Sequence, residues 1–587
     1  MHDEDQNMQP SRRAEVFFWF FAVLTLFLCL GHNALHGSES RWGEIVREMI
    51  VTGDYLHPAT NWEIYFDKPQ LSYWFIIPFA LLMGLDELTL RIPSALAALV
   101  ALYATISLGK RLFDRRTALL AGWILLTSLG FLYWGRAAAA DMANCAAIVW
   151  AVALFYRVEP KANFWGYLGF FMIAFVGALA KGLPAAVVPM VMVFPHLVAE
   201  KRWRKHLNVA SISAAIISAC VYFLPFYVAA VVPPADDFSM PARELSALEL
   251  VWRENIIRVF AAFDHKDPFY SYLYNLPRIM LPWAPLLVVA IAGLVMNWKR
   301  LSSGARELML GSLLVLVMFT CSESRRWYYV LPLAPFVALI GASSLAGLGG
   351  NDKWNRIAVT VMRYAVLVAS ALGVAVLISV PLWGRLLRIE PPLLLAVALP
   401  VAGVLTLVVV IADSRPDNLI ERLVGLPRHL ASMILGGSLM TAAMLSCALP
   451  SFTKYRTEKP FLTDLKPHLA GIEAGRLCFI GTGYNTDALF YLEPNGATVE
   501  IGRKKLRGER RLRRFVKANA GHRVALLAHT RPGEFSQMLR NVFPDGEIDP
   551  DAPDFKEVMH EFSDPDKRAW QVWIVNLSED KINIPMR

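Results

Sequence analysis

The sequence predicts a polytopic α-helical membrane protein that ends in a small soluble α/β domain. Three observations predict this architecture. Of the 587 residues, 56% are hydrophobic and only 18% are charged. Apolar runs of about 20 residues, the length that crosses a bilayer as a helix, recur along most of the chain. In the last part of the chain charged residues become frequent, and short β-rich runs alternate with helix-like stretches.

The apolar runs predict about thirteen transmembrane helices. They fall near residues 16–33, 89–108, 117–133, 141–156, 165–180, 183–199, 207–232, 279–297, 307–321, 327–347, 358–383, 390–413 and 430–450. No small-residue cleavage site follows the first run, so we expect a retained span there, with a signal peptide as the alternative. The run Leu71–Leu85 is shorter and contains Pro78. We expect it to be an interfacial helix, with a further span as the alternative.

The basic residues predict the orientation of these spans. With the amino terminus in the cytoplasm, clusters of Lys and Arg fall on the cytoplasmic connections, at residues 110–116, 201–205, 299–306, 353–356 and 415–428. The positive-inside rule is satisfied only if Leu71–Leu85 does not cross the membrane. The tail after Pro450 then lies outside the cytoplasm. This pattern explains most of the net charge of +9, which is therefore no signal of nucleic-acid binding.

The change in composition predicts two domains. We expect residues 1–451 to form the transmembrane domain, with helices of the first external loop at residues 34–88, and residues 452–587 to form an external α/β domain. The six cysteines show no metal-binding spacing and no disulfide pattern. Three β-rich runs in the second domain are expected to be strands: Leu477–Ile480, Val524–Leu527 and Trp570–Val575.

Two polar features of the tail have alternative interpretations. Gly481-Thr482-Gly483 follows the first expected strand, and it fits either a tight strand-to-helix turn or a phosphate-binding turn. The basic run Arg503–Arg514 fits a solvated helix face, with contact to anionic lipid head groups as the alternative.

The ionisable residues near the spans indicate a site. In the predicted topology the unusual ones gather on the external face, and charge in or near a membrane is costly and tends to mark function. They are Glu39, Glu48, Asp67, Lys68, Asp141, Lys181, Arg325 and Arg326, with Tyr328 and Tyr329 beside the last two. A carboxylate beside several cations suits transfer of a group from a phosphate-linked donor. The carboxylate would take a proton from the acceptor hydroxyl, and the cations would bind and stabilise the departing phosphate.

Each of these residues also has a purely structural interpretation. Asp141 could cap the helix that follows it, and Lys181 could extend its ammonium group to the membrane interface. Arg47 and Glu48 are typical of a solvated or paired helix face. Three aromatic residues fit an interfacial belt as well as a site: Tyr65, Tyr73 and Trp74.

Over roughly the first 340 residues the chain resembles the bacterial polyprenyl-phosphate-dependent glycosyltransferases of the GT-C fold. These are relatives of the protein O-mannosyltransferases and of the aminoarabinose transferase that modifies lipid A. The matching motifs, in chain order, are Glu39-x-Arg41-x-x-Glu44-Ile45-x-Arg47-Glu48-Met49, Gly53-Asp54-Tyr55, Tyr65-Phe66-Asp67-Lys68-Pro69, Arg91-Ile92-Pro93-Ser94-Ala95, Asp141-Met142, Lys181-Gly182-x-Pro184, Leu281-Pro282-Trp283 and Tyr329-Val330-Leu331-Pro332.

The resemblance implies an inner-membrane glycosyltransferase with about thirteen spans, amphipathic helices in the first external loop and a periplasmic C-terminal domain. It also implies transfer of a sugar from undecaprenyl phosphate, or a similar lipid phosphate, with inversion at the sugar carbon. The acceptor would be lipid A, another glycan or a protein. A transporter or flippase for lipids or sugars is the alternative, but it predicts internal repeats and charges at mid-membrane depth, and the sequence shows neither.

The resemblance also implies roles for the candidate residues. Glu39, Asp67 and Asp141 would be catalytic. The substrate-binding residues would be Tyr65, Lys68, Lys181, Arg258, His265, Arg325 and Tyr329. His265 with Asp67 could hold a divalent cation, with a structural histidine as the alternative, so no metal ligand is assigned.

Two departures from the family pattern leave the general base open. The family usually has an Asp-Glu doublet in the first motif, where this chain has Ser38-Glu39. It often has Glu-Lys-Pro-Pro in the second motif, where this chain has Asp67-Lys68-Pro69-Gln70. The base is therefore Glu39, Asp67 or Asp141.

Overall fold

The structure is a computed structural model that falls into two compact units. It describes residues 10–346 and 457–580 except 67, 160, 236–237, 239–248, 250–251, 254–256, 258–260, 262–265, 482–484, 503–504, 532, 545–547 and 559–568, together with residues 357, 360, 364, 424–426, 431 and 434. The first unit contains Met1–His32, Phe66–Pro233 and Leu245–Ser451. The second unit combines Asn33–Tyr65 and Pro234–Glu244 with Phe452–Arg587.

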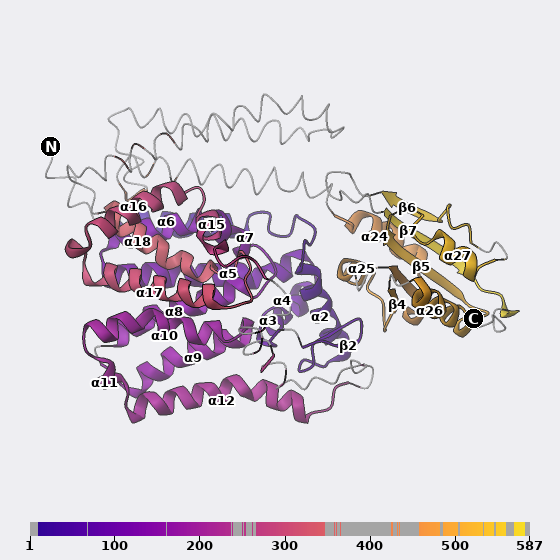
Figure 1. Ribbon diagram of the computed structural model, residues 1–587, viewed down its shortest axis with the longest axis horizontal. Coiled ribbons are helices and arrows are strands. Elements are labelled where there is room, and N and C mark those ends of the chain that lie inside the picture. The colour runs from indigo at the N-terminus through magenta and orange to yellow at the C-terminus, as the bar shows by residue number, and fades with distance from the viewer. Residues whose placement is uncertain are drawn as a thin grey trace. The chain divides into compact units, whose positions relative to one another are not determined.

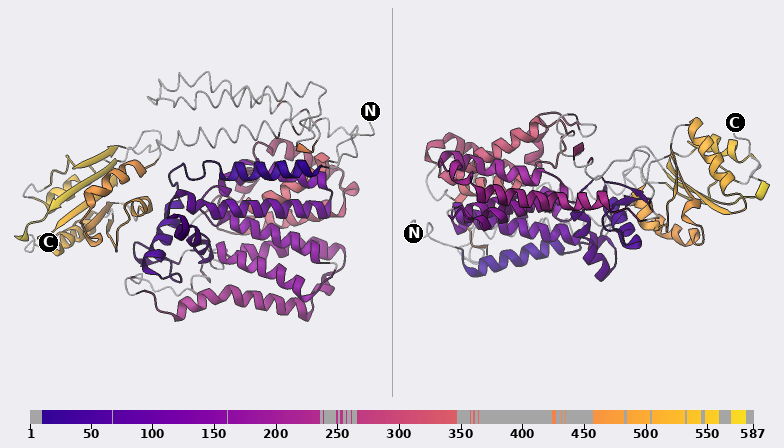
Figure 2. Two further views of the ribbon diagram at one scale, coloured as in Figure 1. Left: turned by 180° about the vertical axis from the view of Figure 1, so that it is seen from behind. Right: turned by 90° about the horizontal axis from the view of Figure 1, so that it is seen from below.

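The first unit is a bundle of helices (Figure 1). Its described helices are α1 (Arg12–Phe27), α3 (Leu71–Trp74), α4 (Ile77–Met83), α5 (Glu87–Leu112), α6 (Arg115–Leu126), α7 (Leu129–Gly135), α8 (Asp141–Val158), α9 (Phe164–Lys181), α10 (Pro184–Ala199), α11 (Trp203–His206), α12 (Val209–Val231), α15 (Ser271–Ile279), α16 (Ala284–Met296), α17 (Ser303–Cys321) and α18 (Ala334–Ala346). Figures 1 and 2 show α5, α8, α9, α10 and α12 running side by side, and each contacts at least one of the others.

Five of the described helices are long and apolar enough to cross a membrane: α5, α8, α9, α12 and α17. The number rises to seven if two bent pairs each count as one span, namely α6 with α7, bent by 69°, and α15 with α16, bent by 114°. The expected spans near 358–383, 390–413 and 430–450 lie outside the described residues, apart from single positions. The total of thirteen therefore stays a prediction.

Several expected helices differ in detail from the sequence analysis: α1 and α18 are shorter than the runs near 16–33 and 327–347, and two other runs are broken. The run 117–133 forms two helices because the chain breaks between them, where the Thr127 and Ser128 hydroxyls donate to the carbonyls of Trp123 and Ile124. The run Leu71–Leu85 forms the short helices α3 and α4, which separate just before Pro78. Neither α3 nor α4 is long enough to count among the spanning helices. Their interfacial location remains a prediction.

Close helix packing brings the start of α8 next to the end of α9. A Cβ atom added to Gly177 of α9 would lie 2.3 Å from the Cβ of Ala147 of α8, so only glycine permits this approach. The two helices are consecutive and joined by a short connection, which makes them antiparallel neighbours. Asp141, the first residue of α8, and Lys181, the last residue of α9, consequently lie at the same end of the bundle.

Two arginines close the carboxyl end of α1. The Arg136 guanidinium donates to the carbonyls of Thr25, Leu26 and Leu28, and Arg91 Nη1 donates to the carbonyl of Leu30. The last carbonyls of a helix have no partner within the helix, and a buried unpaired carbonyl is costly. Arg91, which belongs to a sequence motif, and Arg136 therefore stabilise the fold by satisfying carbonyls at and just after the end of α1.

The second unit contains a five-stranded mixed sheet in the order β4-β3-β5-β7-β6. Its strands are β3 (Leu477–Gly481), β4 (Val499–Gly502), β5 (Arg523–Thr530), β6 (Phe555–Val558) and β7 (Ala569–Asn576). Strand β3 is parallel to β4 and β5, whereas β7 is antiparallel to β5 and β6. The three strands expected from the sequence are confirmed as the central parts of β3, β5 and β7.

Helices cover both faces of this sheet (Figure 1). On one face, α24 (Lys459–Leu465) and α25 (Thr486–Leu492) pack Leu462, Leu489 and Leu492 against alternate strand residues. On the other face, α26 (Lys505–Ala518) and α27 (Ser536–Val542) contribute Leu512, Phe515 and Leu539. The charged side of α26 is exposed at Arg510, Arg511 and Arg514, which confirms the solvated helix face. Lipid contact stays a prediction, and Thr482 and Gly483 of the possible phosphate turn lie outside the described residues.

The first-loop segment Asn33–Tyr65 folds with the C-terminal sheet in the second unit. It forms α2 (Glu39–Thr52) and a small hairpin of β1 (Ala59–Thr60) and β2 (Glu63–Ile64). Helix α2 packs against α25 of the C-terminal part. The segment that contains Glu39 is therefore built partly on residues more than 400 positions away, as the Ser40–Thr486 contact shows.

Candidate functional site

The centre of the candidate site in the first unit is an ion pair between Lys181 and Asp141. Lys181 Nζ contacts Asp141 Oδ1, and the two side chains are only 17% and 10% exposed. Lys181 Nζ also lies 5.0 Å from the ring centroid of Tyr328 and 5.2 Å from that of Tyr329. Aromatic faces attract a cation, so the ammonium group is held by one carboxylate and two rings. Sequence reasoning proposed Asp141, Lys181 and Tyr329 separately, and the structure brings them together.

These contacts decide between the interpretations of the two charged residues. Ala140 is the N-cap residue of α8 and Asp141 is its first helical residue, so Asp141 does not occupy the capping position. Lys181 points to a specific carboxylate and two aromatic rings, so the alternative in which it only extends to the interface is wrong. An ammonium–carboxylate pair can open to accept an anionic ligand, because the lysine can exchange one negative partner for another.

Aromatic residues that sequence reasoning missed surround this pair. The rings of Trp134 and Tyr328 lie 4.6 Å apart, and those of Trp134 and Trp327 lie 5.7 Å apart. The Arg278 guanidinium lies 4.9 Å from the Trp327 ring centroid. The run Trp327-Tyr328-Tyr329 beside two arginines was the available signal for this cluster. Nothing local linked it to Trp134 or Arg278.

The remaining predicted site residues of the first unit are not part of the described contacts around the Asp141–Lys181 pair. Arg325 donates from Nε to the carbonyl of Asp267 at 2.7 Å and from Nη1 to those of Thr320, at 3.1 Å, and Ser322. Its guanidinium thus holds a turn together, and its role in phosphate binding stays a prediction. Lys68 is half-buried. Three predicted site residues lie outside the described residues: Asp67, Arg258 and His265.

Glu39 and Tyr65 belong to the second unit. Glu39 is 7% exposed, and its Oε2 accepts a hydrogen bond of 2.9 Å from the backbone N–H of His36. The Tyr65 hydroxyl accepts one of 3.1 Å from Arg41 Nη1, and the guanidinium lies 5.8 Å from the Tyr65 ring centroid. Arg41 had no assigned role in the sequence analysis. These contacts show that Tyr65 pairs with a cation of its own segment.

Asp487 is an acid near Glu39 that sequence reasoning missed. It lies in the first turn of α25, and burial raises its pKa above the usual range, although a hydrogen bond from Ser40 and the nearby His36 oppose the shift. The carboxylate of Glu39 adds to the upward shift of this pKa. The neighbourhood of Glu39 therefore includes an ionisable group from the C-terminal part of the chain.

The other charged residues of α2 are buried. Arg47 binds Glu44 through Nε at 2.8 Å and Nη2 at 2.7 Å. The fully buried Glu48 accepts the backbone N–H of Trp62 at 3.1 and 3.2 Å. Burial and the adjacent Glu44 raise the pKa of Glu48 to about 9. Of the two alternatives for this helix face, the paired one is therefore confirmed for Arg47, and the solvated one is wrong.

Asp54 organises the turn after α2. Its carboxylate accepts the backbone N–H groups of Leu56, His57 and Ala235 and contacts His57 Nδ1 at 2.8 Å. Burial alone would raise its pKa, but these hydrogen bonds, led by that from Ala235, hold it below the usual range. The motif residue Asp54 thus has a structural role within the second unit.

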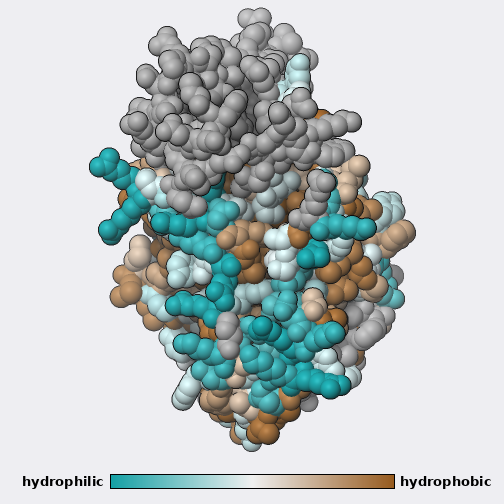
Figure 3. Space-filling model, turned by 90° about the vertical axis from the view of Figure 1, so that its left-hand side faces the viewer, coloured by the Kyte–Doolittle hydropathy of each residue, from teal (hydrophilic) through white to brown (hydrophobic). Residues whose placement is uncertain are grey.

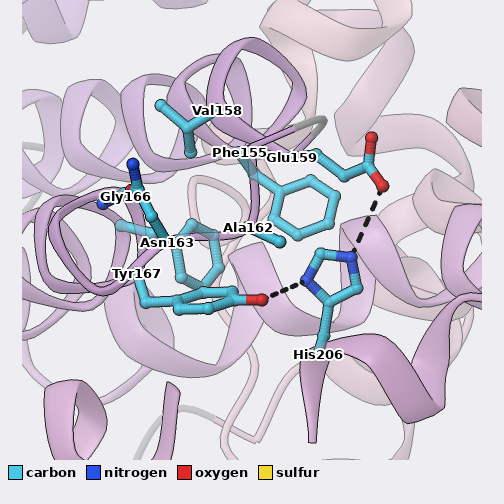
Figure 4. Close-up of a pocket in the computed structure, with 9 residues that line it drawn as sticks. Phe155, Val158, Glu159, Ala162, Asn163, Gly166, Tyr167 and His206 are labelled. Carbon is cyan, nitrogen blue, oxygen red and sulfur yellow. Dashed lines mark hydrogen bonds and ion pairs between the residues drawn. The ribbon is translucent and has the colours of Figure 1, made fainter. Parts of the chain in front are cut away.

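A second polar cluster lies at the other end of α8 (Figure 4). There His206 contacts the Tyr167 hydroxyl through Nδ1 at 3.1 Å and the Glu159 carboxylate through Nε2 at 3.5 Å, beside a small pocket. Arg202 contacts the same carboxylate at 2.6 Å. Because Glu159 follows the last residue of α8 and Asp141 is the first, this cluster is separate from the Asp141–Lys181 pair.

The candidate metal site predicted from the sequence, His265 with Asp67, lies outside the described residues. Within the described ranges, no group of three or more His, Cys, Asp or Glu side chains is arranged to hold a metal ion. The divalent cation therefore stays an untested expectation.

The fold defines a class of protein: a polytopic membrane protein with the GT-C glycosyltransferase fold. The crystal structure of ArnT from Cupriavidus metallidurans bound to undecaprenyl phosphate matches with a TM-score of 0.69, covering 96% of this chain and 98% of that chain at 17% identity. The Archaeoglobus fulgidus oligosaccharyltransferase AglB matches with a TM-score of 0.51, covering 88% and 69% at 10% identity. At sequence identities this low, the two structural matches show that the fold is shared and nothing more.

The family model described as dolichyl-phosphate-mannose-protein mannosyltransferase matches residues 67–228, which include Lys68, Asp141 and Lys181. This stretch of the chain is therefore similar to that family, which confirms the resemblance seen in the sequence motifs.

Curated relatives agree with this assignment. An undecaprenyl phosphate-alpha-4-amino-4-deoxy-L-arabinose arabinosyl transferase from Pectobacterium carotovorum is 30% identical over 363 residues, covering 59% of this chain and 61% of that protein. The protein of the same name from Erwinia tasmaniensis is 28% identical over 389 residues, covering 64% and 67%. The chain thus matches 61% of the first relative's own length, and 67% of the second.

The ion pair predicts a specific stability pattern. Lys181→Met should lower the free energy of unfolding by about 1–3 kcal/mol, because it leaves the Asp141 carboxylate poorly solvated without its cation. Lys181→Met combined with Asp141→Asn should recover most of the loss, since no charge then remains. Thermal unfolding of the full chain in detergent measures both. Equal unfolding temperatures for Lys181→Met and wild type would contradict the pairing.

The raised pKa of Glu48 predicts a pH dependence of stability. Between the ordinary value of 4.5 and about 9, the folded chain holds a proton on Glu48 that the unfolded chain releases, so stability falls as the pH rises through this window. Glu48→Gln cannot ionise and should raise the unfolding temperature at about pH 8.5 by roughly 2–4 °C, the shift that about 1 kcal/mol produces. The exposed Glu534→Gln is the matched control. A Glu48→Gln curve that parallels wild type between about pH 6 and 8.5 would refute the prediction.

Proposed function

We propose that this protein transfers a sugar from a polyprenyl phosphate carrier to an acceptor at the periplasmic face of the bacterial inner membrane. The Asp141–Lys181 ion pair against Tyr328 and Tyr329 carries this proposal. It provides a carboxylate and an exchangeable cation within the residues that match the glycosyltransferase family. The names of the curated relatives support undecaprenyl phosphate as the carrier and aminoarabinose as the first sugar to test.

The chemistry needs one acid and several cations. Glu39, Asp67 or Asp141 takes the proton of an acceptor hydroxyl, whose oxygen forms the new bond to the sugar carbon. The bond from that carbon to the phosphate oxygen breaks, and the electron pair leaves with the polyprenyl phosphate. One direct displacement of this kind inverts the sugar carbon. Lys68, Lys181 and Arg325 hold the phosphate, and cations at that position stabilise the negative charge that develops on it.

The acceptor is the least determined part of the proposal. Lipid A, another envelope glycan and a protein each offer suitable groups on the periplasmic side. Mass spectrometry of the lipids and envelope glycans of a deletion strain identifies the acceptor directly, because the modified species is the one that disappears.

The proposed orientation is supported by the surface charge of the first unit. Figure 3 views the end of the bundle that carries α11 and shows a hydrophilic area bordered by hydrophobic residues. Exposed basic residues of the connections at this end include Lys110, Arg115, Lys201, Arg204 and Lys205. The positive-inside rule assigns such an end to the cytoplasm, and Asp141 and Lys181 lie at the opposite ends of their helices.

Reporter fusions test this orientation. Fusions after Asp67 and after Pro450 should both report a periplasmic position, because the Lys and Arg clusters keep the alternate connections in the cytoplasm. A fusion after Lys201 is the matched control and should report the cytoplasm. A cytoplasmic signal after Pro450 would mean that the number of spans is even and that Leu71–Leu85 crosses the membrane.

The proposed activity is tested with the purified full chain in detergent. Undecaprenyl phosphate carrying a radiolabelled sugar, beginning with aminoarabinose, is incubated with the protein and an envelope lipid extract. Label moving to an acceptor, or released by water, supports the transferase. A transporter or flippase would instead move the labelled lipid between the leaflets of a vesicle and leave its sugar–phosphate bond intact.

The same assay identifies the general base. Glu39→Gln should keep the shape of the side chain and reduce turnover by roughly a hundredfold or more, the usual effect of removing such a group. Adding Ser38→Asp, which restores the doublet typical of the family, should recover part of the rate. Normal turnover of Glu39→Gln, with inactive Asp67→Asn or Asp141→Asn, would assign the base to that residue. Three silent substitutions would contradict the proposed mechanism.

A further inference from the structure

The segment that contains Glu39 is fastened to the C-terminal part of the chain at three points. Before Glu39, the backbone N–H of Leu35 donates to the Tyr491 hydroxyl at 2.9 Å. Directly after it, the hydroxyls of Ser40 and Thr486 share a hydrogen bond of 2.9 Å. The third point is the turn of the β1–β2 hairpin, which contacts Thr498.

This third contact is the most specific of the three. Asn61 Oδ1 accepts the backbone N–H and the hydroxyl of Thr498, each at 2.8 Å, and Asn61 Nδ2 donates to the Thr498 carbonyl at 3.1 Å. Both residues are buried, with exposures of 6% and 7%. One amide side chain thus makes three hydrogen bonds to one residue, which fixes both its position and its orientation.

The turn itself adopts an uncommon backbone conformation. Asn61 and Trp62 have φ angles of 55° and 62°, as a tight two-residue hairpin turn requires. Asparagine tolerates this region, whereas a tryptophan there costs of order 1–2 kcal/mol. Such a conformation persists only when its surroundings determine it. Here Thr498 holds Asn61, and Glu48 of α2 accepts the N–H of Trp62.

These contacts make one connected structure. Glu48 and Glu39 belong to the same helix, so a hairpin turn held by Thr498 also fixes the distance of α2 from the sheet. Ser40 contacts α25 within the first turn of α2, next to Glu39. The C-terminal part therefore restrains α2 both at its first turn and, through the hairpin, near its last turn.

We propose that the C-terminal α/β domain is a positioning element for Glu39, acting through Thr498 on the Asn61–Trp62 turn and through Thr486 on Ser40. This inference rests on the proposed function and takes Glu39, one of its three candidate bases, as the residue that accepts the acceptor proton. A base must hold its geometry closely, because a displacement of about 1 Å can reduce a rate by about a hundredfold. Asn61 and Thr498 are positioning residues, since they act through α2 and the hairpin.

One substitution removes the contact with Thr498 without changing the hairpin turn. Asn61→Gly removes all three hydrogen bonds to Thr498 and keeps the turn, because glycine adopts positive φ readily. Thr498→Val removes only the hydroxyl bond. Arg540→Ala, which breaks an exposed ion pair with Asp551 elsewhere in the same domain, is the matched control.

Steady-state kinetics of the full chain give the decisive measurement. We expect Asn61→Gly to lower kcat by about tenfold to a hundredfold and to leave the KM for the polyprenyl phosphate donor within about twofold, because the donor's phosphate is held by other residues. The kcat of Thr498→Val should lie between those of Asn61→Gly and wild type, and the kcat of Arg540→Ala should equal that of wild type. Amide hydrogen exchange in peptides covering α2 should be faster in Asn61→Gly, and unchanged in Arg540→Ala.

The outcomes separate this inference from the proposed function. If wild type transfers sugar and Asn61→Gly keeps its kcat, the positioning role is refuted, even if its unfolding temperature falls. A rise in donor KM equal to the loss in kcat/KM would also refute it. If wild type transfers no sugar from any polyprenyl phosphate donor, the proposed function itself fails, and the inference that rests on it falls as well.

Discussion

The need to pair every buried charge is the constraint on which the rest of this structure depends. In the first unit it pairs Asp141, at the start of α8, with Lys181, at the end of α9. The same constraint directs Arg91 and Arg136 to the carbonyls at the end of α1. The arginine–carbonyl contacts and the Asp141–Lys181 pair differ in whether they can also bind a ligand. A guanidinium bound by several carbonyls stabilises the fold, whereas an ammonium group that faces one carboxylate and two rings can also bind an anionic ligand.

Features that depend on local sequence were predictable. The apolar runs gave the positions of α5, α8, α9 and α12 because length and hydrophobicity alone define a spanning helix. The β-rich runs gave the cores of β3, β5 and β7 for a similar reason. The sequence also assigned Asp141 and Lys181 to one face of the membrane, because the positive-inside rule predicted the orientation of the spans. It could not show that they form a pair, since nothing local determines which way each side chain points.

Features that depend on distant contacts were not predictable. The sequence left the polar face of α2 either solvated or paired, and it could not show that packing in the second unit buries Glu44, Arg47 and Glu48 together. Asn61-Trp62 lacks the glycine that normally marks a tight hairpin turn, because Thr498 and Glu48 supply the restraint instead. Thr498 is 437 positions from Asn61, and no pattern in the sequence connects them.

Glu39 is the acid that remains in the first motif, and it lies on a helix that packs against the C-terminal part of the chain. Glu39 is one of the three candidate bases of the proposed mechanism, and its side chain has one more rotatable bond than an aspartate would have. Ordering such a side chain costs up to about 2 kcal/mol of conformational entropy, which must be offset before the carboxylate can work in one fixed place. Burial of Glu39 and its hydrogen bond from His36 restrain the side chain, and the Ser40–Thr486 bond restrains the helical turn that carries it. As a base, Glu39 would therefore depend on its surroundings for a fixed position, and part of that restraint comes from the C-terminal part of the chain.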